Sequence, residues 1–180
     1  MCILCNNDSC YDVCMDKLLL VIDMQEGFRH PASEGIVATL LGLNEAFKGV
    51  VRYARFVDTP NSQFESQLDW RKFQNDKEQR LFREFQVLNV TSFSHSGYTV
   101  FTPELQDYVT REQIKEVYVT GIYTDVCVLK TVMDIFDAGI EVFVVADACA
   151  SLHGESNHKY ALDSLRHIVG KDHVMMSADL

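Results

Sequence analysis

The chain has little positive charge and no long hydrophobic run. It carries 16 Lys and Arg against 26 Asp and Glu, which gives a formal net charge of −10. Because nucleic-acid binding depends largely on positive charge facing phosphates, we expect no nucleic-acid partner. No apolar run exceeds the length of residues 18–22, which is far too short to span a membrane. Asp8 and Asp12 fall where a signal peptide would have basic and then apolar residues, so we expect a cytoplasmic protein.

Cysteine is scarce outside the first fourteen residues. In a reducing cytosol a disulfide framework is not expected, so the early cysteines are either free or bound to a metal. Four thiols can meet the tetrahedral geometry of zinc, but their spacing, C-x2-C-x4-C-x3-C, is not that of a familiar zinc finger. We therefore favour a tail of uncertain role over residues 1–14 and one domain over residues 15–180, with Met15 as an alternative native start. The early cysteines are Cys2, Cys5, Cys10 and Cys14, and those of the body are Cys127 and Cys149.

Short apolar segments alternate with amphipathic ones after Met15. The segments typical of strands are residues 18–22, 50–56, 117–121, 141–146 and 173–176. The segments typical of helices are residues 36–47, 127–138 and 158–168. Such alternation predicts right-handed crossovers and a three-layer α/β/α sandwich with a mostly parallel, doubly wound sheet. Residues 57–85 show little periodicity apart from an expected helix over 77–85.

Two chemically active side chains follow predicted strands, at the sheet edge where ligands of such folds gather. Asp23 comes directly after the strand at 18–22, and Cys127 lies at or near the start of the helix after the strand at 117–121. A helix N-terminus favours a thiolate, and its backbone N–H groups can bind the negative oxygen of a tetrahedral intermediate. A carboxylate beside a thiol can accept its proton. Cys127 is thus a candidate nucleophile with Asp23 as its base, and inert packing is the alternative for a single cysteine.

The sequence resembles the isochorismatase-like cysteine hydrolases, the family that includes nicotinamidases and related amidases. The most specific matching motifs are D-x-Q at residues 23–25 and G-x-x-T-D-x-C-V at residues 121–128. Similar segments at 95–105 and 158–165 extend the resemblance over nearly the whole chain after Met15. The resemblance implies an enzyme with the same sandwich fold, assembled as a homo-oligomer, either a dimer or a tetramer.

The family resemblance also implies a mechanism. An Asp, a Lys and a Cys form the family's catalytic triad, and Asp23 and Cys127 occupy two of these places. The thiolate attacks a carbonyl-type carbon, the Asp shuttles the proton, and water then cleaves the thioester. A non-proline cis peptide is implied between Ile122 and Tyr123, with the backbone N–H groups of Tyr123 and Cys127 binding the oxyanion.

The third place of the triad holds His95, where the family has lysine. That lysine stands three residues before the aromatic of an aromatic-Ser/Thr-x-Phe segment, here residues 98–101, and no lysine lies between Lys77 and Lys115 to replace it. His95 can supply positive charge or a hydrogen bond to the other two residues, as Cys–His pairs do elsewhere. The alternative is that His95 merely fills the site, which leaves a catalytically weakened protein that binds a small molecule or a partner protein.

Histidine is absent between His30 and His95, where nicotinamidases of the family carry an Asp-x-His and further histidines that bind a metal. Asp58 alone cannot form such a site, because an imidazole-type metal site needs several converging ligands, and we therefore predict no metal and no cofactor. Cys127 argues against a true isochorismatase, since those generally lack the cysteine. The prediction that remains is a hydrolase for a small amide, carbamoyl or ureido compound. The side chains expected to line its pocket are Phe28, Tyr98 and Tyr123.

Overall fold

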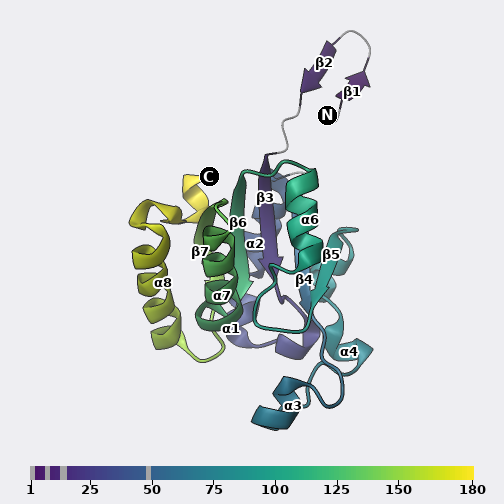
Figure 1. The fold of residues 1–180 in the computed structure, drawn as a ribbon, viewed down its shortest axis with the longest axis vertical. Helices are drawn as coiled ribbons and strands as arrows, with labels where there is room; N and C mark the ends of the chain where they lie inside the picture. Colours follow the sequence, from purple (N-terminus) through teal and green to yellow (C-terminus); the bar gives the residue numbers. More distant parts are fainter. Residues whose placement is uncertain (1–2, 7–8, 13–15, 48–49) are drawn as a thin grey trace.

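The structure, a computed structural model, describes residues 3–6, 9–12, 16–47 and 50–180. The first two strands, β1 (Ile3–Asn6) and β2 (Ser9–Asp12), pair with each other in antiparallel fashion, apart from the main sheet (Figure 1). The zinc prediction for the early cysteine side chains and the domain boundary at Met15 lie outside the described residues.

The main sheet has six strands, all parallel, in the order β5-β4-β3-β6-β7-β8. From β3 the chain moves outward through β4 to β5 and then returns to β6, beside β3, before it continues to β7 and β8. This order confirms the doubly wound sheet predicted from the sequence, and the sheet is wholly parallel. The strands are β3 (Lys17–Ile22), β4 (Val51–Phe56), β5 (Thr91–His95), β6 (Glu116–Ile122), β7 (Glu141–Ala150) and β8 (Val174–Met175).

Helices connect the strands. The α-helices are α1 (Pro31–Gly35), α2 (Val37–Ala46), α3 (Gln63–Leu68), α4 (Asp76–Gln79), α5 (Arg83–Gln86), α6 (Pro103–Arg111), α7 (Leu129–Asp137) and α8 (Glu155–Val169). Short 3-10 turns lie at Glu26–Phe28, Lys171–His173 and Ser177–Asp179, and one π-helical turn lies at Thr124–Val128. Within the described part of the chain, no helix has both the length and the apolar character that crossing a bilayer requires.

The sheet is buried on both faces, which explains why its central strand is a continuous apolar run. Alternate side chains of β3 enter two hydrophobic clusters: Leu18, Leu20 and Ile22 belong to one, and Leu19 and Val21 to the other. Helices α6, α7 and α8 pack on the first face, and α1, α2 and α5 on the second (Figure 1). The three predicted layers are therefore present.

Two expected helices differ from the structure. The helix expected over 77–85 is wrong, because an extended residue, Arg80, separates α4 from α5. Backbone bonds impose this break: Leu81 forms a bridge with Gln25, and the N–H of Phe82 donates to the carbonyl of Met24. The helix expected from Cys127 onward begins at Leu129 instead, and Cys127 lies within the preceding π-helical turn. Strand β5 and helix α6 had no clear signal in the sequence.

Gly121 lets β6 approach β3 closely at the sheet edge that carries the candidate nucleophile. It pairs with Ile22 across the two strands, with φ at +104°. A Cβ atom at this position would lie 2.1 Å from the carbonyl oxygen of Ile22. Only glycine fits both the backbone conformation and the spacing. The turn that holds Cys127 therefore starts directly beside Asp23, which follows Ile22.

Candidate active site

Asp23 and His95 form a buried ion pair at the carboxyl edge of the sheet. Asp23 follows the last residue of β3 with φ at +58°, a left-handed conformation that aspartate adopts more readily than most residues. His95 ends β5, and β4 lies between the two strands. The Nε2 atom of His95 lies 2.8 Å from Oδ1 of Asp23, and the two side chains are 1% and 0% exposed. The structure thus brings together two of the three predicted catalytic side chains.

The contacts of His95 favour a protonated, positively charged ring. Its Nδ1 atom lies 2.8 Å from the carbonyl oxygen of Gly97, and its Nε2 atom faces the Asp23 carboxylate. A carbonyl oxygen and a carboxylate only accept hydrogen bonds, so both ring nitrogens must donate, as they do in imidazolium. Burial alone would lower the pKa of His95, but the charge and hydrogen bond of Asp23 and the Gly97 carbonyl outweigh it and raise the pKa above 6.5.

Cys127 lies next to this pair with its thiol protonated. The residue is 7% exposed within the π-helical turn. Burial, followed by the charge of Asp23, raises the pKa of the Cys127 thiol well above 9, and the backbone N–H of Tyr123 only partly opposes this shift. The Oδ2 atom of Asp23 is buried, and a hydrogen bond between the Asp23 carboxylate and the Cys127 thiol contributes to the raised pKa of the thiol. The carboxylate is thus held by His95 through Oδ1 and also interacts with the thiol.

The peptide bond between Ile122 and Tyr123 is cis, as the family resemblance implied. Tyr123 then caps the turn: its carbonyl accepts hydrogen bonds from the N–H groups of Val126 at 3.1 Å and Val128 at 3.0 Å. These bonds fix the backbone around Cys127. The oxyanion hole assigned to the N–H groups of Tyr123 and Cys127 stays a prediction.

A cavity of about 240 Å³ opens beside Cys127. The three side chains predicted to line it, Phe28, Tyr98 and Tyr123, all do so. Sequence reasoning missed the other lining residues, because most come from the segment without periodicity or from loops. Only Phe56, at the carboxyl end of β4, stood where the sheet-edge rule could have found it. The missed residues are Phe56, Phe64, Leu68, Trp70, Val126 and His153.

A second histidine–carboxylate pair lies at the cavity. The Nδ1 atom of His153 is 2.7 Å from Oδ2 of Asp125, and the His153 ring packs against Tyr123 with ring centroids 4.9 Å apart. Burial would raise the pKa of Asp125, but hydrogen bonds from Ser151 and His153 lower it. Asp125 is therefore ionised at neutral pH and holds the His153 ring in place.

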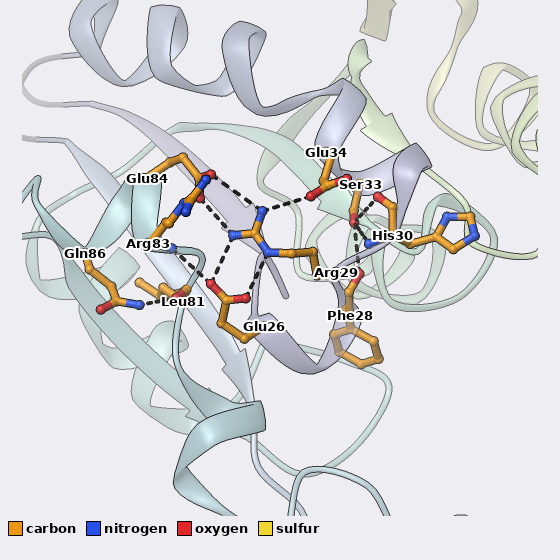
Figure 2. Close-up of polar contacts among 10 residues, drawn as sticks. All are labelled: Glu26, Phe28, Arg29, His30, Ser33, Glu34, Leu81, Arg83, Glu84 and Gln86. Carbon is orange, nitrogen blue, oxygen red and sulfur yellow. Dashed lines mark hydrogen bonds and ion pairs between the residues drawn. The ribbon is translucent and has the colours of Figure 1, made fainter.

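Two networks behind the cavity fix its wall. The Gln25 side chain donates to the carbonyls of Phe56 and Gln79, both at 2.9 Å, and accepts from the N–H of Phe56 at 2.7 Å. In the next turn, Arg29 binds the carboxylates of Glu26, Glu34 and Glu84, as Figure 2 shows. Phe28 lies between Gln25 and Arg29 in the sequence. Its ring packs against Phe73 and Tyr123 at the cavity. In the sequence, Gln25 stood out only as part of the D-x-Q motif.

The metal site of nicotinamidases has no counterpart among the described residues. No group of three or more His, Cys, Asp or Glu side chains converges there. Asp58 is buried, and its Oδ2 atom lies 3.5 Å from Nε2 of Gln74. One carboxylate without converging His, Cys, Asp or Glu partners does not form such a site, so the described residues at this position do not fit the metal.

Residues 17–175 match the family model of the isochorismatase domain. The chain is 34% identical to isochorismatase domain-containing protein 2 of Rattus norvegicus over 84 residues, which cover 47% of this chain and 40% of that protein. It is 30% identical to the secreted isochorismatase effector Isc1 of Phytophthora sojae over 155 residues, which cover 83% of this chain and 69% of that protein. The match thus spans less than half of the rat relative's length.

Solved structures share the fold at low sequence identity. An isochorismatase-like hydrolase from Alkaliphilus metalliredigens has a TM-score of 0.82 at 22% identity and covers 91% of this chain and 96% of that chain. A nicotinamidase from Bacillus subtilis has a TM-score of 0.80 at 23% identity, covering 89% and 99%. An N-carbamoylsarcosine amidase from Thermoplasma acidophilum has a TM-score of 0.80 at 21% identity, covering 92% and 98%.

Proposed function

The chain belongs to the isochorismatase family, and on this premise we propose that it hydrolyses the C–N bond of a small amide, carbamoyl or ureido compound through a thioester on Cys127. One observation carries the proposal. The buried Asp23 carboxylate binds His95 through Oδ1 and also interacts with the protonated thiol of Cys127. A base with an available oxygen beside a thiol is the arrangement that activates a cysteine nucleophile.

In the first half of the proposed reaction, Asp23 accepts the thiol proton while the Cys127 sulfur bonds to the carbonyl carbon. The carbonyl oxygen becomes an oxyanion, which the backbone N–H groups of Tyr123 and Cys127 bind. When the tetrahedral intermediate collapses, the C–N bond breaks and the proton held by Asp23 passes to the nitrogen. Ammonia or an amine leaves, and the acyl group stays on Cys127 as a thioester.

In the second half, water attacks the thioester. Asp23 accepts a proton from the water as the new C–O bond forms, the C–S bond breaks, and the proton returns to the Cys127 sulfur. The net change is addition of one water across the C–N bond. His95 takes the place of the family lysine as a positioning residue, because its imidazolium holds Asp23 in the orientation that presents Oδ2 to the thiol.

The decisive experiment measures ammonia release from a panel of small amides, carbamoyl and ureido compounds. We expect turnover of at least one class by the intact chain, and none above background by Cys127→Ala, because the thioester cannot form without the thiol. A trapped acyl group on Cys127, seen by mass spectrometry of the intact protein, is the second readout. Turnover that survives in Cys127→Ala would contradict the mechanism. Ligand binding with no turnover of any class would favour the alternative, a catalytically weakened binding protein.

We also propose that the chain assembles into a homodimer or homotetramer. Its expected location is the cytosol, and its expected partner is a small-molecule substrate, with neither nucleic acid nor membrane. The family resemblance supports the homo-oligomer, and sedimentation equilibrium is its test. One relative, from Phytophthora sojae, is named a secreted effector, so the cytosolic location stays a prediction to be tested by cell fractionation.

A further inference from the structure

The wall of the cavity beside Cys127 is almost entirely aromatic. Phe64 packs edge-to-face against Tyr98 with centroids 5.1 Å apart, and Phe28 does the same against Tyr123 at 5.5 Å. Trp70 lies 5.6 Å from Phe64. Rings that already pack against one another keep their positions without a ligand. They present flat apolar surfaces on which another ring can stack, and such aromatic contacts favour offset or edge-to-face geometry.

The cavity offers no partner for a negative charge. Of the described residues that line it, none is lysine or arginine. His153 is the one histidine among the described lining residues, and its Nδ1 atom already lies 2.7 Å from Oδ2 of the Asp125 carboxylate. Arg71, next to Trp70 in the sequence, is paired with Glu65 and Asp69.

Two carboxylates near the cavity lie behind lining residues, and each is paired with a histidine. Asp23 lies behind Cys127 and is fully buried. Asp125 lies behind His153, and its Oδ1 atom is buried without a hydrogen bond among the described residues. A carboxylate entering this apolar space would lose its water and find no lysine or arginine among the described lining residues, which is strongly unfavourable.

The volume sets the size of the ligand. An apolar protein cavity of roughly 150 Å³ holds benzene. The cavity here, at about 240 Å³, therefore has room for one six-membered ring and a carboxamide directed at Cys127.

We propose that the cavity selects small amides whose body is an uncharged aromatic ring and rejects amides that carry a carboxylate. The inference rests on the proposed function only in taking the amide as the substrate. Because the described residues form no metal site, a ring nitrogen gives no advantage, and benzamide binds at least as well as nicotinamide. Within the amide, carbamoyl and ureido compounds of the proposed function, those with a free carboxylate are excluded.

The test compares two ligands of one shape in the Cys127→Ala variant, which binds without turnover. Terephthalamide is neutral, and 4-carbamoylbenzoate replaces one carboxamide with a carboxylate. Trp70 is the chain's single tryptophan and lines the cavity, so its fluorescence reports binding directly, with calorimetry as a check. We expect terephthalamide to bind at least tenfold more tightly than 4-carbamoylbenzoate, and benzamide at least tenfold more tightly than propanamide. Equal or reversed affinities in either comparison would overturn the proposal.

A matched pair of variants isolates charge from shape. Tyr98 lines the cavity at its exposed rim, so Tyr98→Arg and Tyr98→Gln both remove the same ring without disturbing the core. Relative to Tyr98→Gln, Tyr98→Arg should improve the affinity for 4-carbamoylbenzoate at least tenfold and leave that for terephthalamide within twofold. If Tyr98→Arg and Tyr98→Gln bound 4-carbamoylbenzoate with the same affinity, charge would not govern which ligands the cavity binds.

Ammonia release by the unmodified chain separates this inference from the proposed function. Selective binding of the neutral ligand with no turnover would leave the inference standing and overturn the proposed hydrolysis. Turnover of terephthalamide and 4-carbamoylbenzoate with equal kcat/KM would support hydrolysis and overturn the inference.

Discussion

At the scale of single residues, His95 is where this chain departs from its family's triad. Both ring nitrogens donate to oxygen acceptors, so the side chain supplies a full positive charge 2.8 Å from Asp23, as a lysine would. The difference lies in how the charge responds to pH. A lysine keeps its proton to about pH 10, whereas an imidazolium loses it much closer to neutrality.

This difference predicts a pH dependence of the rate. The pKa of His95 is raised above 6.5, so the imidazolium is fully present below that value and is lost, with the activity that it supports, as pH rises through the raised pKa. The Cys127 thiol, with its pKa well above 9, cannot produce this decline. We expect kcat/KM of the wild-type chain to fall on the alkaline side, and His95→Lys to move the decline to higher pH. His95→Ala should lose about a hundredfold or more in kcat/KM.

A pH–rate profile of the three proteins over pH 5 to about 10 is the measurement, with circular dichroism to verify folding. An alkaline decline at the same pH in the wild-type chain and His95→Lys would show that His95 does not set it. Full activity in His95→Ala would show that the buried charge is unnecessary.

At the scale of elements, the close contact of β6 with β3 requires that residue 121 has no side chain, as glycine does. Gly121→Ala would place a Cβ atom 2.1 Å from the Ile22 carbonyl oxygen at a φ of +104°. The strands must then separate beside Asp23, and we expect a loss of roughly 3 kcal/mol or more in the free energy of unfolding. Gly42→Ala is the matched control: Gly42 lies in α2 with nothing within 4 Å of an added Cβ, so it should gain about 0.5–1 kcal/mol. Equal urea midpoints for the two variants would contradict the close approach.

The turn after β3 is tied to α5 by the ion pair of Arg29 with Glu84 (Figure 2). The Arg29 guanidinium also lies 4.0 Å from the centroid of the Phe82 ring. The contact with Arg29 lowers the pKa of Glu84 to about 2 and also lowers that of Glu26. A lowered pKa stabilises the fold above the ordinary value of 4.5, and this stabilisation is lost as pH falls toward 2. The Arg29 cluster therefore supports the Phe28 side of the cavity at neutral pH and releases it in acid.

Arg29→Met removes these ion pairs and keeps an apolar stem over Phe82. We expect a loss of about 2 kcal/mol at pH 7, because charged hydrogen bonds contribute more than neutral ones but the groups are partly solvent-exposed. The loss should shrink as pH falls below 4.5 toward 2. Arg166→Met, which breaks an exposed pair with Asp163 on α8, should cost less than about 0.5 kcal/mol. Urea titrations across pH measure both, and a pH-independent loss would refute the role assigned to Glu84.

At the scale of the whole molecule, the sequence predicted the parts whose structure depends on local pattern. Buried parallel strands such as 18–22 are continuous apolar runs, and Asp23 and Cys127 follow from the rule that ligands gather at the carboxyl edge. Strand β5 was missed because it is an edge strand of mixed polarity, with alternate residues facing solvent. Its end nevertheless carries His95, which the family motif located.

Residues 57–85 could not be predicted, because long-range contacts shape them. Trp70 stacks on Phe73 with planes 17° apart, and Phe73 in turn lies 4.1 Å from Phe28, a residue far away in the sequence. Contacts between residues so far apart produce no periodic pattern of apolar residues in the sequence. The same holds for His153, whose place at the cavity depends on Asp125 in another loop.

Every strand of the main sheet runs in one direction, so the molecule has two chemically different ends. Strand β3 starts at Lys17, and Asp23 follows its last residue. At ~3.3 Å per residue, Lys17 and Asp23 lie about 20 Å apart along the strand. Figure 1 shows β1 and β2 at the end opposite α3, which carries the cavity residue Phe64. An affinity tag or surface anchor joined ahead of Lys17 would therefore leave the mouth of the cavity open to solution. A layer of molecules immobilised in this way would face its substrate uniformly.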